Sequence, residues 1–324
     1  VLMKVVAGVP VTSLGTASDI YYISASSGMY ASYFVRSDGS VDRLKGGSTV
    51  SQRVLPPEKT KYIAASAGLH ASYFLRDDGA VDRTTGGQVD KIDTIWPAAQ
   101  GSMKDLFAGK LTYVAVSNSM GPCYLLRSDG MVDCVHSGEV TQTLDSSYVQ
   151  ICGGTDCSYH LKKDGSVDKI WRKGQVSATF SGPYVSVATQ CVSGKNDKGG
   201  GGATSIYFIK ANGSVDRASI MSSKVEMTMA PPAGVQYTAV SCQDTSSYLL
   251  RSDGAIDRTT GGGKISNTMN PPPGCAYVQV SAGQWASYFV RSDGKIDRTT
   301  GGGKISTTID PAAEPEDKGN CSVM

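Results

Sequence analysis

The stretch Arg291-Ser-Asp-Gly-Lys-Ile-Asp-Arg-Thr-Thr-Gly-Gly-Gly-Lys-Ile-Ser306 repeats, almost unchanged, the stretch Arg251-Ser-Asp-Gly-Ala-Ile-Asp-Arg-Thr-Thr-Gly-Gly-Gly-Lys-Ile-Ser266. The Asp-Gly pair near its start recurs along the whole chain. Its copies are Asp38-Gly39, Asp78-Gly79, Asp129-Gly130, Asp164-Gly165, Asn212-Gly213, Asp253-Gly254 and Asp293-Gly294. Self-similarity at a period near 40 residues is typical of repeat architectures. The chain therefore consists of seven units.

Two tyrosines mark every unit at constant places. One opens the unit, and these are Tyr22, Tyr62, Tyr113, Tyr148, Tyr184, Tyr237 and Tyr277. The other lies five residues before each Asp-Gly or Asn-Gly pair, and these are Tyr33, Tyr73, Tyr124, Tyr159, Tyr207, Tyr248 and Tyr288. Together they are 14 of the 16 tyrosines in the chain. Both series give the same seven units as the Asp-Gly pairs do.

Each unit reads as strands, because its apolar residues alternate or form short β-branched runs bounded by Gly, Pro and Asp. In the last unit the expected strands are 277–281, 286–292, 295–299 and 304–309. We expect Asp293-Gly294 to be a two-residue hairpin turn. Pro311 follows the fourth strand, as proline cannot donate to a ladder.

Four strands in about 40 residues, repeated seven times, predict an all-β fold: a seven-bladed β-propeller of four-stranded antiparallel blades. The propeller would span residues 20–310. Residues 1–19 contain the apolar run Val5–Val11 and are expected to close the ring by pairing with the last blade. Residues 311–324 are expected to form a flexible tail. A linear solenoid is the alternative architecture.

The composition excludes several classes of protein. The chain has 324 residues and a net charge of +2, without the basic stripe of a nucleic-acid-binding protein, so we expect no nucleic acid partner. Three histidines in separate units and the absence of Cys-x₂-Cys pairs argue against a metal site. The Gly-Gly-Gly-Lys loops lack the strand–loop–helix context of a phosphate-binding loop. We therefore expect no cofactor and no enzymatic activity.

Eight cysteines occupy non-equivalent places in the units, which favours reduced, buried thiols. Cys152 and Cys157 are a separate case, because they flank the loop between the first two strands of the fourth unit. A disulfide between them is a possibility that the sequence leaves open.

Charged residues recur in two positions of every unit. A third-strand aspartate is present in all seven, at Asp42, Asp82, Asp133, Asp168, Asp216, Asp257 and Asp297. Basic residues precede the turn (among them Arg36, Arg76, Arg127, Arg251 and Arg291) or follow the aspartate (among them Arg43, Arg83, Arg217, Arg258 and Arg298). A two-residue turn would send aspartate and arginine to opposite faces of a blade. We therefore predict ion pairs between neighbouring blades. The alternative is a rim of arginines that binds an acidic partner.

The stretch Ser66-Ala-Gly-Leu-His-Ala-Ser-Tyr-Phe-Leu-Arg-Asp-Asp-Gly-Ala-Val81 resembles the repeat of the regulator of chromosome condensation family, and the likeness covers all seven units. The resemblance implies a seven-bladed propeller, in a family that includes a guanine-nucleotide exchange factor for a small GTPase. The Trp-Gly signature that follows the third strand in that family is missing here, and only His70 keeps its histidine. The chain thus resembles a divergent member.

The last four residues, Cys321-Ser-Val-Met324, fit the pattern for prenylation of Cys321, with a terminal methionine that favours a farnesyl group. The acidic residues upstream and the lack of a second lipidated cysteine predict weak membrane attachment. A chance C-terminus is the alternative. Prenylation would place the protein in the cytoplasm, associated with a membrane.

From these observations we expect a non-enzymatic scaffold that binds a protein partner or joins a larger complex. One alternative is a structural subunit of a larger assembly, lumenal or secreted, in which Cys152 and Cys157 are oxidised. Another is an exchange factor for a small GTPase.

Overall fold

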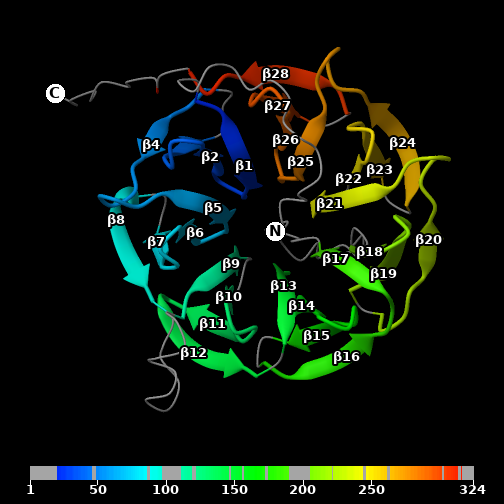
Figure 1. Cartoon of the computed structure of the whole chain (residues 1–324), viewed down its shortest axis with the longest axis horizontal. Coiled ribbons are helices and arrows are strands. Elements are labelled where there is room, and N and C mark those ends of the chain that lie inside the picture. Colours follow the sequence, from blue (N-terminus) through cyan, green and yellow to red (C-terminus); the bar gives the residue numbers. More distant parts are fainter. Residues whose placement is uncertain are drawn as a thin grey trace, which may run out of the picture.

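The computed structural model describes residues 20–45, 49–85, 88–96, 111–118, 122–145, 147–154, 157–171, 174–189, 205–220, 222–243, 246–260, 263–300, 303–312 and 315. These residues form 28 strands in seven four-stranded antiparallel sheets. The sheets surround a central axis as the blades of a propeller, with the first strand of each blade innermost (Figure 1). The predicted all-β, seven-bladed fold is confirmed. Over these residues no helix has the length and hydropathy needed to cross a membrane.

The strands follow one another in every blade in the order of the sequence. Blades 1 to 3 comprise β1–β4 (Tyr22–Ser27, Ser32–Arg36, Val41–Leu44, Gln52–Val54), β5–β8 (Tyr62–Ala67, Ala71–Arg76, Val81–Thr85, Gln88–Ile95) and β9–β12 (Tyr113–Ser117, Cys123–Arg127, Val132–His136, Glu139–Leu144). Blades 4 and 5 comprise β13–β16 (Tyr148–Gly153, Cys157–Lys162, Val167–Trp171, Val176–Phe180) and β17–β20 (Tyr184–Thr189, Ser205–Lys210, Val215–Ser219, Met227–Met229). Blades 6 and 7 comprise β21–β24 (Tyr237–Gln243, Ser246–Arg251, Ile256–Thr260, Lys264–Met269) and β25–β28 (Tyr277–Ser281, Ser287–Arg291, Ile296–Thr299, Ile305–Ile309).

The ring closes where blade 7 meets blade 1. The amide of Tyr22 donates to the carbonyl of Gly294 at 2.9 Å, and the amide of Ser27 donates to the hydroxyl of Ser281 at 2.9 Å. These contacts exclude the linear solenoid. The two blades at this seam each consist of four consecutive strands. The segment 1–19, expected to close the ring, lies outside the described residues.

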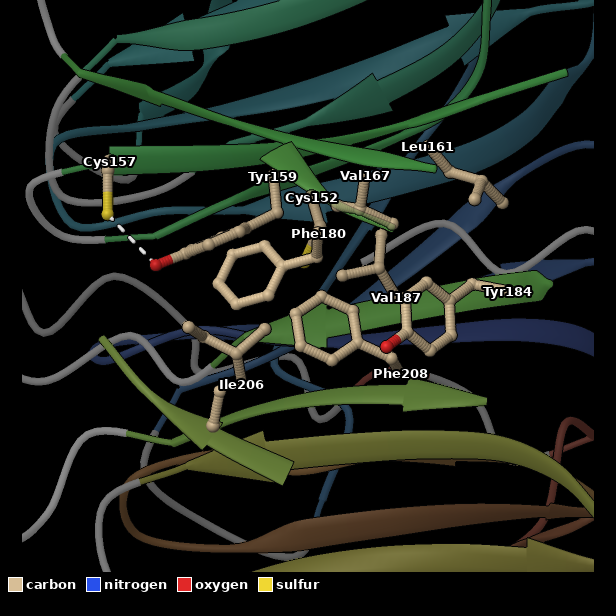
Figure 2. Close-up of a cluster of buried hydrophobic side chains, with 11 residues drawn as sticks. Cys152, Cys157, Tyr159, Leu161, Val167, Phe180, Tyr184, Val187, Ile206 and Phe208 are labelled. Atoms are coloured by element: carbon tan, nitrogen blue, oxygen red, sulfur yellow. Dashed lines mark hydrogen bonds between the residues drawn. The ribbon is translucent and has the colours of Figure 1, made fainter. Parts of the chain in front are cut away.

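The apolar core is divided into seven clusters, one at each seam between neighbouring blades. Figure 2 shows the cluster between blades 4 and 5. There the ring of Phe208 lies 4.8 Å from that of Phe180 and 4.9 Å from that of Tyr184, measured between centroids. Side chains from both faces of each sheet are thereby buried, which is why the middle strands read as continuous apolar runs.

The hairpin between the second and third strands differs from the predicted two-residue turn. In blade 1 the amide of Arg36 donates to the carbonyl of Ser40, and the amide of Gly39 donates to the carbonyl of Arg36. The loop therefore has three residues, and Gly39 closes it with a positive φ of 91°. All seven units have this turn, with a glycine at the same position.

The three-residue turn shifts the register of the hairpin. Asp42 lies opposite Phe34, whereas a two-residue turn would have placed it opposite Val35. A shift of one residue moves a side chain to the other face of a sheet. Asp42 and Arg36 consequently share one face of the blade, and the same holds in the other blades.

Candidate interaction surface

Each third-strand aspartate is buried and bound within its own blade. The tyrosine that opens the blade donates its hydroxyl to the carboxylate, as in Tyr237 to Asp257 at 2.8 Å. The basic residue before the turn approaches the same carboxylate, as in Arg251 to Asp257 at 3.4 Å. The ion pairs are Arg36–Asp42, Arg76–Asp82, Arg127–Asp133, Lys162–Asp168, Lys210–Asp216, Arg251–Asp257 and Arg291–Asp297, at distances from 2.7 to 3.8 Å.

The fourth strand completes this arrangement with a hydroxyl group. Thr268 donates to Asp257 at 2.6 Å, and a threonine does the same in blades 2 to 7, whereas Arg53 takes this place in blade 1. Burial, followed by the hydrogen bond to Asp216 and its charge, raises the pKa of Tyr184 to about 12. The tyrosine hydroxyl therefore stays protonated at neutral pH and donates to the carboxylate. Both carboxylate oxygens of Asp216 thus accept a hydrogen bond, one from Tyr184 and one from Thr228.

The predicted pairing of these aspartates with a neighbouring blade is wrong. The three-residue turn puts aspartate and arginine on the same face, so that they meet inside one blade. Asp42, Asp82 and Asp133 are fully buried, and the other four aspartates are at most 5% exposed. The burial of Arg36, Arg76 and Arg127, each at most 8% exposed, argues against a rim of these arginines that binds an acidic partner.

The basic residue after the aspartate does reach the next blade. A Cβ placed on Gly303 in blade 7 would lie 3.2 Å from Cδ of Arg258 in blade 6. In the same way, Cδ of Arg217 would lie 3.6 Å from a Cβ on Gly263 in blade 6, and Nη1 of Arg83 would lie 3.2 Å from a Cβ on Gly138 in blade 3. Arg43 and Arg298 occupy the equivalent ladder positions in blades 1 and 7. This series thus contributes to contacts between blades through the turns. Where its members pair with a carboxylate, the partner lies on the fourth strand of the same blade or just before it, as in Arg83–Asp93 at 3.2 Å and Arg217–Glu226 at 3.8 Å.

A belt of backbone hydrogen bonds joins all seven seams on the face that carries the Asp-Gly turns. The turn glycine of one blade accepts from the amide of the opening tyrosine of the next, at 2.9 to 3.1 Å. A Cβ on Gly254 would lie 2.6 Å from Cβ of Ala276. Glycine is therefore required at the turn both for its positive φ and for this close approach.

A second belt joins the inner strands. Ser26, Ser66, Ser117, Ser241 and Ser281 each accept the amide of a residue in an adjacent blade. Cys152 has this position in blade 4, and its sulfur lies 3.2 Å from the amide nitrogen of Thr189. Cys152 thus replaces the serine that accepts the seam hydrogen bond in five other blades.

Cys152 and Cys157 are both buried, and no disulfide joins them. They lie on the same face, but Tyr159, not Cys157, is the ladder partner of Cys152. Cys157 donates to the hydroxyl of Tyr159 at 3.3 Å, as the dashed line in Figure 2 shows. The two cysteines belong to the apolar cluster between blades 4 and 5, and the possible disulfide is not formed.

Three exposed side chains with rings lie on the opposite face from the Asp-Gly turns. This loop face is formed by the loops between first and second strands and by the turns between third and fourth strands. Trp285 in blade 7 is 73% exposed and Tyr30 in blade 1 is 66% exposed, and His70 in blade 2 is also exposed. All three have the same place, two residues after the loop glycine. No sequence motif indicates a role for Tyr30 or Trp285.

Direct contacts hold these three loops side by side. A Cβ on Gly283 would lie 2.7 Å from Cβ of Ser27, and a Cβ on Gly28 would lie 2.8 Å from Cβ of Ala67. The innermost strands of the three blades, β25, β1 and β5, are neighbours around the axis (Figure 1). The three aromatic side chains therefore belong to one continuous sector of the loop face.

Comparison with known proteins supports the fold. No protein-family profile and no curated protein sequence matches the chain. Among solved structures it resembles human WBSCR16 (14% identity, TM-score 0.57, 83% of this chain and 86% of that chain). It also resembles Prp20p from Saccharomyces cerevisiae (10%, TM-score 0.55, 81% and 80%) and a virginiamycin B lyase from Staphylococcus aureus (12%, TM-score 0.61, 88% and 96%). WBSCR16 and Prp20p are of the regulator of chromosome condensation type, and at these identities the likeness shows the propeller fold.

Proposed function

We propose that the protein is a non-catalytic scaffold that binds a protein partner through its loop face. The observation that carries this proposal is the exposure of Trp285, Tyr30 and His70 at one loop position of three consecutive blades. Large aromatic side chains are enriched at the centres of protein interfaces. The seven third-strand aspartates, by contrast, are buried in structural clusters within the blades.

The solved structures agree with this proposal at the level of fold. The Prp20p structure was described together with its binding to Gsp1p and histones. The virginiamycin B lyase has a similar fold and is an enzyme, so the fold alone does not decide between binding and catalysis. The site, and not the fold, therefore supports the proposal.

Site-directed photo-crosslinking in an extract of the native source tests this function. A photoreactive phenylalanine at position 285 or 30 should form a cross-link to one and the same protein. The same residue at position 55, which is exposed on the opposite face, should not. Affinity purification with Trp285→Ala/Tyr30→Ala should then lose that protein, and with Leu55→Ala should retain it. Equal recovery with both variants would refute the proposal.

Two finer points belong to the same proposal. Cys321 would carry a farnesyl group that holds the scaffold weakly on a cytoplasmic membrane surface. The intact mass of the protein from its native source would show the added mass of this group.

The identity of the captured protein separates the alternative functions. A GTPase whose nucleotide release is accelerated by this protein would favour the exchange factor. Capture of a stable, stoichiometric complex would favour a structural subunit.

A further inference from the structure

Three lysines extend the aromatic sector of the loop face. Lys45 follows β3 in blade 1, Lys264 begins β24 in blade 6, and Lys304 precedes β28 in blade 7. All three are exposed, and each lies at the turn between third and fourth strands. Because these turns and the aromatic loops leave their blades on the same side, the lysines share the loop face with Trp285 and Tyr30.

Among the described residues, the loops and turns of blades 6, 7, 1 and 2 on this face contain no carboxylate of their own. The acidic turn residue Glu139 belongs to blade 3. Glu226 of blade 5 lies at the edge of the sector, because the adjacent Met227 packs against the turn at Gly263 of blade 6, but Glu226 pairs with Arg217 at 3.8 Å. On the opposite face, by contrast, basic residues are paired with turn aspartates, as Arg291 is with Asp293. The sector of blades 6, 7, 1 and 2 therefore combines exposed aromatic groups with positive charge.

We infer that this sector binds an acidic protein segment that places apolar or aromatic side chains against Trp285 and Tyr30. This inference rests on the proposed function and specifies the chemistry of the partner. Complementary charge guides a partner to its site, and aromatic anchors then supply most of the binding energy. Lysines with exposed rings also suit single-stranded nucleic acid. The protein segment is favoured, because a net charge of +2 gives no basic groove along which a phosphate backbone could run.

Selection of displayed random 12-residue peptides on the immobilised full chain tests the inference without knowledge of the natural partner. Peptides that also bind the variant Trp285→Ala/Tyr30→Ala are removed by counter-selection. The enriched peptides should have a net negative charge and contain aromatic or large aliphatic residues. Enrichment of neutral or basic peptides, or of none that depends on the two aromatic residues, would overturn the inference.

Affinity measurements on one enriched peptide separate the two contributions. Trp285→Ala should weaken its binding about tenfold. The charge reversal Lys45→Glu/Lys264→Glu/Lys304→Glu should weaken it by a similar factor and flatten its dependence on salt concentration. Lys163→Glu, at an exposed turn on the opposite face, is the matched control and should leave the affinity unchanged.

The outcomes distinguish this inference from the proposed function. A partner that cross-links at position 285 but binds equally well after charge reversal and at high salt would leave the scaffold standing and refute the acidic partner. Tighter binding of an oligothymidine probe than of any enriched peptide would also refute it, in favour of single-stranded nucleic acid. If neither position 285 nor position 30 formed a cross-link to a protein, the proposed function itself would be refuted.

Discussion

His160 gives the protein a specific sensitivity to acid. Its side chain is fully buried between the rings of Tyr124 and Tyr148, whose centroids lie 5.2 and 5.0 Å away, and both imidazole nitrogens lack a hydrogen-bond partner. Burial lowers the pKa of His160 to about 3, although the charge of Asp168 acts in the opposite direction. Phenylalanine occupies the equivalent ladder position in four other blades, as in Phe34. We predict that His160→Phe folds normally and loses less stability in acid.

The sign and size of the effect follow from proton linkage. The unfolded chain has a histidine pKa near 6.5, so below that pH the unfolded state binds a proton that the folded state does not. Stability is therefore lost as the pH falls from about 6.5 toward 3, and His160 has no such effect above this range. Between pH 7.5 and pH 5.0 the loss through His160 amounts to about 2 kcal/mol, at 1.4 kcal/mol per pH unit.

Urea denaturation of the wild type and of His160→Phe at pH 7.5 and pH 5.0, followed by tryptophan fluorescence, measures this difference. Other titrating groups cancel between the two proteins. His136→Gln, at an exposed position, is the control and should behave as the wild type does. Equal losses of stability for the wild type and His160→Phe between the two pH values would refute the reasoning.

Three further substitutions test the seams and the charged clusters. Asp257→Asn should lower the free energy of unfolding by about 3 kcal/mol, because Tyr237, Thr268 and Arg251 lose the charge of the buried carboxylate that they share, and no change in chemical denaturation would contradict this cluster. Gly254→Ala should lower the free energy of unfolding at least twice as much as Gly234→Ala does. Gly234 has a similar φ, but a Cβ at that position would meet no other atom. Equal decreases in melting temperature for the two variants would argue against the close approach at the seam. Cys152→Ser should change stability by less than about 1 kcal/mol, because a serine hydroxyl can accept the Thr189 amide as serine does in five other blades, and a larger loss in the same assay would contradict that equivalence.

The number of blades and strands could be predicted from the sequence because the pattern recurs seven times. The register of the hairpin could not, since an Asp-Gly pair fits a two-residue turn as well as the last positions of a three-residue one. This difference of one residue in turn length decides whether Asp257 lies on the same face as Arg251 or points to a neighbouring blade. The sequence did contain a signal: opening tyrosine and aspartate are 20 residues apart in six units, and 32 apart in the fifth unit with its insertion.

The interaction surface was harder to predict. Trp285 and Tyr30 differ in type, so neither repeats as a motif, and their likeness appears only when the loops are superposed by position. His70 matches the family's histidine in the sequence, but that match does not indicate that its side chain is exposed. Contact between loops of separate units depends on how closely neighbouring blades approach. In this sector that approach is set by Gly28, which packs against Ala67, and by Gly283, which packs against Ser27.

The seam between the last and first blades uses the glycine–tyrosine bond of all six other seams and the inner-strand bond of five of them. Spatial order and chain order thus coincide all the way round, and no bond described here depends on where the polypeptide is interrupted. A circular permutant opened at any connection between blades would keep every cluster and both belts. The first and last blades of the native order are therefore ordinary members of the ring.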